Sequence, residues 1–442
     1  MRTLFQALSR FRRDRSGNIA IIFALAALPI VTAVGCAVDY SRANQIRSKL
    51  ISAADAASVG SLAKASPAFI AAGSMTSDGS IAVGVADATK IFNGNVFNQN
   101  GYTLTNLSPT VTKTGNVITS TVSFTANVPT MFLGVIGRKT MSVGGSSTST
   151  ANLPLYIDFY LLLDNSPSMG VAATPTDVTT MVNNTSDKCA FACHDYNDPN
   201  NYYNLAKTLG VTTRIDVLRS ATQQLMDTAA ATATYSNQFR MAIYDFGASS
   251  KTIGLRALFS LSSSLSSAKS AAGNIDLMGV YGNNDAYTAD KDTPFTTSLP
   301  AMNLQISAPG AGTSSAPLKY LFFVSDGVAD EYNPACLKKT VSGGRCQSPI
   351  DPTLCTAIKT RGIKIAVLYT TYLQLPTNSW YMSYIDPFNK GPFGPSPNSE
   401  IAQNMQSCAS PGLYFEVSPT QGISAAMNAL FQKAVADARI SS

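Results

Sequence analysis

A short polar segment after residue 163 holds the residue types best suited to chemistry. Residues 155–163 form an apolar run of strand length that leads into Asp164-Asn-Ser166-Pro-Ser168. A carboxylate and two hydroxyls on one tight loop are hard oxygen ligands. A hard divalent cation such as Mg²⁺ prefers six such ligands in octahedral geometry. The segment therefore predicts one half of a cation site.

A second apolar run supplies the other half of the pattern. Residues 318–325 lead into Asp326-Gly327. The carboxyl ends of parallel strands meet at one edge of a sheet, where ligands bind in doubly wound folds, so we expect Asp326 to lie near Asp164. Nothing in this set activates a nucleophile, and the one histidine of the chain is His194. We therefore expect a binding protein and no enzyme.

These two motifs together resemble the metal-ion-dependent adhesion site of von Willebrand factor type A domains. The resemblance implies that two serines and a threonine touch the metal and that the aspartates act mainly through water. The threonine is assigned to Thr297 in residues 295–302, because the apolar residues after it then point inward on a helix; Thr296 is the adjacent alternative. The implied ligands are Asp164, Ser166, Ser168, Thr297 and Asp326.

The same resemblance implies a cofactor and a kind of partner. The ion is Mg²⁺ or another divalent cation such as Mn²⁺ or Ca²⁺. Its sixth coordination position is open to an acidic side chain, so a partner protein supplies a carboxylate. The alternative is a domain that keeps the fold without the metal and serves as a structural scaffold.

Strands and helices alternate through the region that must position these residues. Such alternation predicts an α/β fold with a doubly wound, mainly parallel sheet. The predicted strands after residues 155–163 are 238–247, 255–261, 318–325, 364–370 and 413–418, and the last helix is 421–439. The resemblance covers residues 153–440, with large insertions at 171–213, 330–355 and 372–400. The first two leave from the metal-bearing edge, so we expect them to form a rim that selects partners.

The N-terminus has the pattern of a membrane anchor. Residues 1–17 form a basic tail with five arginines against Asp14, and residues 18–38 carry no charge. Twenty-one apolar residues suffice to cross a hydrocarbon core of about 30 Å. The basic flank predicts a cytoplasmic tail and an extracytoplasmic, periplasmic C-terminal domain on a single-pass anchor in the inner membrane. A cleaved signal peptide and a buried soluble helix are the alternatives.

The next segment, residues 39–150, combines a long helix with a small sheet. Helical spacing of apolar residues continues to about residue 62. Polar loops are expected next, then a hairpin of residues 102–107 and 117–126 turning at Gly115-Asn116, and a short strand in 141–152.

This N-terminal part resembles the TadE/TadG-like proteins of Flp (tight-adherence) pilus assembly. A glycine precedes the apolar span, and an Ala-Ala-Asp-Ala-Ala run centred on Asp55 follows it. Pilin-like members carry a glutamate five positions after the processed glycine, where this chain has Ile22. We therefore expect an assembly or anchoring component that binds other pilus-system proteins. A minor pilin-like component is the alternative.

Charge and cysteine content narrow the class of partner. Only 13% of residues are charged, and four units of the net +6 lie in residues 1–15, which argues against a nucleic-acid partner. Six of the seven cysteines follow the span by a wide margin and predict up to three disulfides. Cys189, Cys193 and His194 could also contribute to a zinc site, but a disulfide is the better interpretation.

Overall fold

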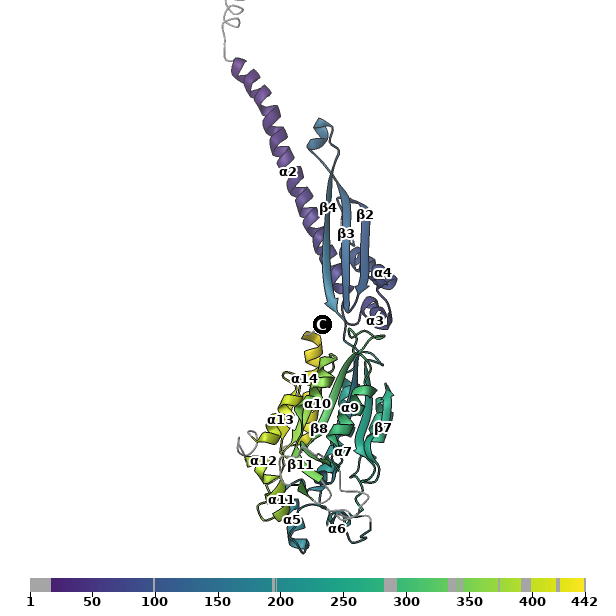
Figure 1. Cartoon of the computed structure of the whole chain (residues 1–442). Coiled ribbons are helices and arrows are strands. Elements are labelled where there is room, and N and C mark those ends of the chain that lie inside the picture. The colour runs from purple at the N-terminus through teal and green to yellow at the C-terminus, as the bar shows by residue number, and fades with distance from the viewer. Residues whose placement is uncertain are drawn as a thin grey trace, which may run out of the picture. The chain divides into compact units, whose positions relative to one another are not determined.

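The computed structural model divides the chain into two compact units, Met1–Leu153 and Pro154–Ser442 (Figure 1). The structure describes residues 17–97, 100–192, 195, 197–281, 292–332, 340–341, 345–372, 374–390, 399–418 and 422–440.

The first unit is built on one long helix, α2 (Gly17–Gly60), drawn in purple in Figure 1. Its first half leaves large apolar side chains uncovered, with Ile19 74% and Phe23 73% exposed. Within the described residues it is the one helix long and apolar enough to cross a membrane. Because protein does not cover this half, it does not resemble the core helix of a soluble domain. The structure thus agrees with a single N-terminal anchor.

The second half of α2 packs on a four-stranded antiparallel sheet. Ile46, Leu50, Ala54 and Ala57 recur at helical spacing and are buried, and Leu62, just past the end of α2, is buried as well. The strands, in sheet order, are β1 (Gly79–Ser80), β2 (Thr103–Thr114), β3 (Val117–Pro129) and β4 (Thr140–Asn152). Gly115 has φ +58° at the turn between β2 and β3, so the predicted hairpin is present.

Two helices occupy the region where polar loops were expected, so that expectation was wrong. They are α3 (Pro67–Ser74) and α4 (Ala82–Asn95). The Ser66 hydroxyl caps α3, whose first residue is Pro67. Gly84 of α4 must lack a side chain, because a Cβ there would meet Ala68 and Val111 within 3 Å. Small residues weaken the sequence signal of α4, while tertiary packing stabilises it.

The second unit is a six-stranded sheet covered by helices on both faces. Its strands, in sheet order, are β13 (Tyr414–Val417), β12 (Lys364–Thr370), β8 (Leu318–Ser325), β5 (Ile157–Leu163), β6 (Phe239–Gly247) and β7 (Ile253–Ser262). Five strands are parallel, and the edge strand β7 is antiparallel to β6. This arrangement confirms the predicted α/β fold class.

The helices divide between the two faces of that sheet. One face carries α7 (Arg214–Thr232), α8 (Leu265–Ala272) and α14 (Ile423–Ile440). The other carries α9 (Phe295–Gln305), α10 (Pro352–Thr360) and α13 (Glu400–Cys408). Alternate residues of β5 enter the two cores, Leu161 on the first face and Leu162 on the second. A strand buried on both faces reads as a continuous apolar run, as the sequence showed.

The three insertions contain structure of their own. Residues 171–213 include α5 (Pro175–Asn184) and α6 (Tyr202–Thr208). Residues 330–355 include parts of a small antiparallel sheet of β9 (Val328–Tyr332), β10 (Thr340–Val341) and β11 (Arg345–Pro349). Residues 372–400 include α11 (Ser379–Tyr384) and α12 (Asp386–Lys390).

Disulfides are present in the second unit. Cys355 and Cys408 join α10 to α13, and Cys346 is also disulfide-bonded. Cys193, His194 and Cys336 lie outside the described residues, so the proposed disulfide or zinc role of the first two has no structural account.

Candidate metal centre

Two neighbouring strands bring the predicted carboxylates to one edge of the sheet. Strands β5 and β8 are paired in parallel, with Leu163 opposite Val324. The Asp164 N–H donates to the Val324 carbonyl at 2.9 Å. Asp164 and Asp326 are each the first residue after their strand, and both are fully buried.

Hydroxyl groups surround the Asp164 carboxylate. Its Oδ1 accepts from the Ser166 N–H at 2.9 Å and from the Ser166 hydroxyl at 2.5 Å. The Ser325 hydroxyl donates to Oδ2. The Ser166 and Ser168 hydroxyl oxygens are 2.9 Å apart. The structure therefore brings Asp164, Ser166 and Ser168 together and adds Ser325, whose hydroxyl the sequence interpretation did not use.

Asn165 fixes the loop that carries the two serines. Its side-chain amide donates to the Gly247 carbonyl at 2.8 Å and accepts from the Phe246 N–H at 3.1 Å. Its backbone carbonyl accepts from the Met278 N–H at 2.7 Å. The short 3₁₀ helix η2 (Pro167–Gly170) follows at once. These bonds hold the hydroxyls in place before any ligand arrives.

The Asp326 carboxylate is incompletely hydrogen-bonded. Its Oδ1 accepts a long bond from the Val328 N–H at 3.4 Å, and its Oδ2 is buried with no hydrogen-bond partner among the described residues. Burial, aided by the charge of Asp164, raises the pKa of Asp326 to about 7. Burial also raises the pKa of Asp164, although the Ser166 and Ser325 hydroxyls oppose that shift. A buried carboxylate without a partner is costly, and a cation would remove that cost.

The chemical types of the available ligand atoms suit a hard cation. It consists of carboxylate and hydroxyl oxygens, the ligands that Mg²⁺ and Ca²⁺ prefer. In the described part of the chain no group of three or more His, Cys, Asp or Glu side chains is gathered to hold a metal. A site of two carboxylates and several hydroxyls does not require such a group. Ser168 is partly exposed, so the edge is open to solvent beside the buried carboxylates.

The predicted threonine ligand makes its hydrogen bond away from the serine loop. Thr297 is exposed in the first turn of α9, and its hydroxyl donates to the Pro294 carbonyl at 3.2 Å. Thr296 is exposed too, and its hydroxyl donates to Glu331 at 2.5 Å. Neither bond joins the serine loop, so Thr297 stays a prediction.

A third threonine near this edge is Thr293. It is buried just before α9, and its backbone pairs with Asp330 through two bonds of 3.2 Å. Asp330 follows Asp326 by four residues. The order Asp-Thr-Pro at 292–294 is a local signal that could have directed attention to Thr293.

A buried arginine adjoins this edge, and sequence reasoning missed it. Arg214 begins α7 and is fully buried. Its N–H donates to the carbonyl of Val171, which directly follows η2, at 3.0 Å. Its guanidinium donates to the Thr371 carbonyl and lies 5.8 Å from the centre of the Tyr372 ring. These contacts place a positive charge beside the serine loop.

The Arg214 charge is only partly compensated. Two guanidinium nitrogens, Nε and Nη1, have no hydrogen-bond partner among the described residues. Burial lowers the pKa of Arg214, and the charges of Asp326 and Asp164 act in the opposite direction. The charge of one guanidinium therefore interacts with those of two carboxylates, and among the described residues some polar atoms of these groups are left without hydrogen-bond partners.

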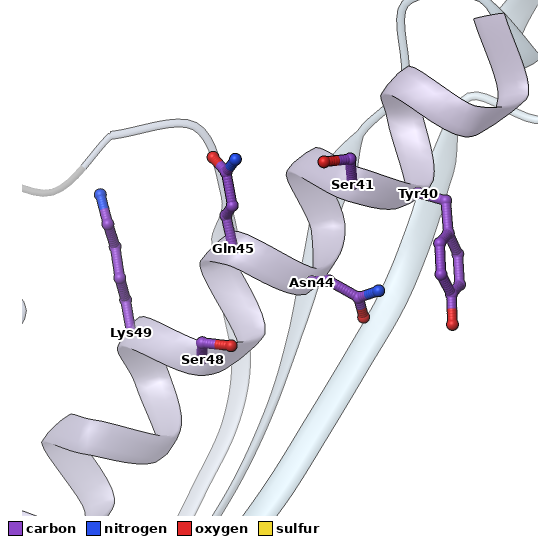
Figure 2. A pocket seen from close by; sticks show the side chains of 6 residues that line it. All are labelled: Tyr40, Ser41, Asn44, Gln45, Ser48 and Lys49. Carbon is purple, nitrogen blue, oxygen red and sulfur yellow. The ribbon is translucent and has the colours of Figure 1, made fainter. Parts of the chain in front are cut away.

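The exposed face of α2 carries a polar stripe. Figure 2 shows the six exposed side chains that line an open hollow there: Tyr40, Ser41, Asn44, Gln45, Ser48 and Lys49. All six come from α2 itself, on the side away from the buried Ile46 and Leu50. The hollow encloses no volume between elements, so it is an exposed helix face rather than a ligand cavity.

Comparison with known families concerns the first unit. Residues 17–62 match the family model described as "Putative Flp pilus-assembly TadE/G-like". No curated protein sequence matches the chain.

Solved structures give weak likenesses. One is the von Willebrand factor domain of the type V pili tip protein Mfa5 from Porphyromonas gingivalis, with TM-score 0.36, 10% identity and coverage of 64% of this chain and 97% of that chain. Another is a mutant of the PilB minor pilin from Streptococcus sanguinis, with TM-score 0.33, 12% identity and coverage of 76% and 78%.

A third is proximal thread matrix protein 1 from the mussel byssus, whose structure has a zinc-occupied MIDAS motif. Its TM-score is 0.30 at 12% identity, and the match covers 64% of this chain and 46% of that one. None of these values is high enough to carry an argument about function. The family match is confined to residues 17–62, and it shows that this segment is similar to the TadE/G-like pilus-assembly family, in agreement with the resemblance that the sequence predicted.

Proposed function

We propose that this chain is a membrane-anchored pilus-assembly or adhesion protein that binds a protein partner through a divalent cation. The cation is held at the carboxyl edge of β5 and β8, and Mg²⁺ is the first choice. The partner supplies a carboxylate. The proposed ligand residues are Asp164, Ser166, Ser168, Asp326 and a threonine, Thr297 or Thr293.

The observation that carries this proposal is the buried Oδ2 of Asp326, which has no hydrogen-bond partner among the described residues and lies near the charge of Asp164. Two carboxylates sharing a buried site repel each other unless a positive charge or a proton separates them. The Ser166 and Ser168 hydroxyls are already positioned, 2.9 Å apart, to add neutral oxygens. A divalent cation bound there supplies positive charge, to which an acidic side chain of a partner can bind.

The chain's own residues then have distinct tasks. Asp164 and Asp326 provide negative charge, and the serines provide neutral ligands. Ser325 and Asn165 hold the Asp164 loop in place through the bonds described above. Because Arg214 offsets part of the negative charge, the site with a bound cation carries a net positive charge. That sign favours an acidic partner over a basic one.

Arg214 also favours a second candidate function, a metal-independent scaffold. A buried guanidinium near both aspartates stabilises the sheet edge to some extent without a metal ion. In that case the TadE/G-like segment would make the essential contacts, with α2 packing laterally against other pilus-system helices. The two candidates differ in whether partner binding needs a cation.

A cross-linking pull-down with and without Mg²⁺ separates them. The anchored full-length protein is cross-linked in membranes, and the captured proteins are compared for wild type and for Asp164→Ala. Asp227→Ala is the matched control, because Asp227 is an exposed aspartate of the same unit paired with Lys269. We expect Mg²⁺-dependent capture by wild type and the control, and none by Asp164→Ala. Equal, EDTA-resistant capture by all three proteins would support the scaffold.

The proposed location is the inner membrane, with the second unit outside the cytoplasm. This follows from the basic residues before the span. Protease added to intact cells, to cells with a permeabilised outer membrane and to spheroplasts measures it directly. We expect the second unit to be cleaved while the inner membrane is still intact. Cleavage only after inner-membrane rupture would contradict this orientation.

A further inference from the structure

The loop between β3 and β4 exposes an unusual number of apolar side chains. We call residues 130–139, which include the short helix η1 (Leu133–Ile136), the tip loop. Four of its large apolar side chains are exposed: Met131 70%, Phe132 40%, Val135 82% and Ile136 58%. A soluble surface seldom gathers so many in ten residues, and such patches mark contact with a protein or a membrane.

The tip loop is hydrogen-bonded to α2 through Asp39. The Asp39 carboxylate accepts the backbone N–H groups of Met131, Phe132 and Leu133 at 2.9, 2.9 and 2.8 Å. The bond from Leu133 is the largest cause of a lowered pKa at Asp39, so this carboxylate is held in its charged form. Three bonds to one side chain fix the loop against the helix.

A second contact lies one turn earlier in α2. A Cβ atom placed on Gly35 would be 2.4 Å from the Cβ of Phe132, so only glycine allows the approach. Gly35 belongs to the uncharged stretch of residues 18–38, and α2 continues through it without a break. At a rise of 1.5 Å per residue, Gly35 lies about 6 Å before Asp39 along the helix. Part of the tip loop is therefore level with the end of the apolar span. Figure 1 shows the connection between β3 and β4 extending beyond the ends of these strands.

Basic and tyrosine side chains lie near the end of the apolar span. Arg138 and Lys139 are exposed at the end of the tip loop, and Tyr40 is 60% exposed on α2 directly after Asp39. Basic side chains bind anionic lipid headgroups, and tyrosine is enriched where a bilayer meets water. The apolar side chains would thus lie in the hydrocarbon layer, and the tyrosine and the basic pair at the level of the headgroups.

We infer that the tip loop is a second membrane contact: Met131, Phe132, Val135 and Ile136 enter the leaflet from which α2 emerges, and Arg138 and Lys139 lie among its headgroups. The inference rests on the apolar half of α2 being a membrane span, and it goes beyond the metal-dependent function. A lipid surface is favoured over a neighbouring protein because the loop packs directly against the end of the span. With two attachment points, the first unit cannot rotate freely about α2.

Tryptophan quenching by brominated lipid tests this contact in the full-length protein. In a Trp380→Phe background the chain has no other tryptophan. Three single-tryptophan variants, Val135→Trp, Val31→Trp and Val117→Trp, are reconstituted in vesicles of phosphatidylglycerol and acyl-chain-brominated phosphatidylcholine. Val31 lies in the span and is the positive control. Val117 is the first residue of β3, whose other end leads into the tip loop, and it is the negative control. All three valines are exposed, so tryptophan fits without disturbing the core.

We expect the fluorescence of Trp at 135 to be blue-shifted and quenched, as at 31, while Trp at 117 keeps its intensity. Quenching at 31 with none at 135 would overturn the inference and leave a neighbouring protein as the occupant of the tip. Absence of quenching at 31 would overturn it as well, because the span would then not be in the bilayer. Equal quenching at 135 and 117 would show non-specific adsorption and also contradict it.

Discussion

A buried aspartate lies at each end of strand β5, and the two differ in how their charges are paired. Asp158, near its start, is paired with Lys319 and with Arg240, whose Nε and Nη2 donate to its two oxygens at 2.6 Å. In the described part of the chain, Asp164, just past the end of the strand, accepts hydrogen bonds from neutral hydroxyl and N–H groups alone, and one oxygen of its neighbour Asp326 has no partner. One end is charge-compensated by the chain, and the other is left with unpaired charge.

This difference separates a structural group from a binding group. Both aspartates are buried in the same sheet, so burial alone does not mark function. What differs is whether cations of the chain complete the pairing. A native fold tolerates incomplete pairing mainly where a ligand supplies the missing interaction. The comparison therefore makes predictions about each end.

The largest effect on stability is expected from Asp158→Ala. The substitution leaves Lys319, which is almost fully buried, without its counter-charge. Breaking a buried ion pair by removing one partner costs about 3–5 kcal/mol. Chemical denaturation of the second unit should show that loss, while Mn²⁺ affinity in the remaining folded protein should be unchanged. If the variant had wild-type stability, the ion pairs of Asp158 would not stabilise this end of the strand, and the comparison would fail.

The next largest effect is expected from Arg214→Met, and it is a gain in metal affinity. Removal of the guanidinium eliminates repulsion between Arg214 and a bound cation, so Mn²⁺ should bind roughly tenfold more tightly. Arg240→Met at the other end of the sheet removes a like charge and is the control. Calorimetric titration measures both. Unchanged or weaker Mn²⁺ binding in Arg214→Met, with its fold intact by circular dichroism, would show that Arg214 does not oppose the metal.

The pH dependence of metal binding follows from Asp326. Its pKa in the folded chain is raised to about 7, so the native state binds a proton more tightly than the unfolded state does. Without metal, stability should therefore fall as pH rises from about 4 to about 7. Metal binding displaces that proton, so Mn²⁺ affinity should weaken by about tenfold per pH unit below about 7. Thermal unfolding with and without Mn²⁺ across this range gives both trends, and a pH-independent metal effect would contradict them.

The smallest expected difference is between two threonines. Thr297 is exposed, so Thr297→Ala should change stability by no more than about 0.5 kcal/mol. We expect Thr293→Ala to weaken Mn²⁺ binding more than Thr297→Ala, because Thr293 is buried beside the segment that follows Asp326. The reverse order would support the threonine that the sequence alone favoured.

Part of this site could be predicted from sequence for a physical reason. Strands β5 and β8 are buried on both faces, so they are apolar almost throughout, and an aspartate directly after such a run stands out. Parallel pairing of two such strands then places both carboxylates at one edge without further information.

Arg214 and the helices α3 and α4 could not be predicted in the same way. Arg214 looks like any first-turn residue of an amphipathic helix, and only the fold brings it to a loop that follows a different strand. Helix α4 is rich in small residues and depends on packing against neighbours distant in sequence. The contact of the tip loop with Gly35 likewise requires the three-dimensional structure.

The most direct measurement of the central claim is Mn²⁺ titration of the full-length protein in detergent, compared with Asp326→Asn. The substitution keeps the shape of the side chain and removes its charge. We expect wild type and the exposed control Asp227→Asn to bind one Mn²⁺ that Mg²⁺ displaces, and Asp326→Asn to have lost that binding. A wild-type protein that binds no divalent cation, or an Asp326→Asn variant that binds it equally well, would contradict a metal site at this edge.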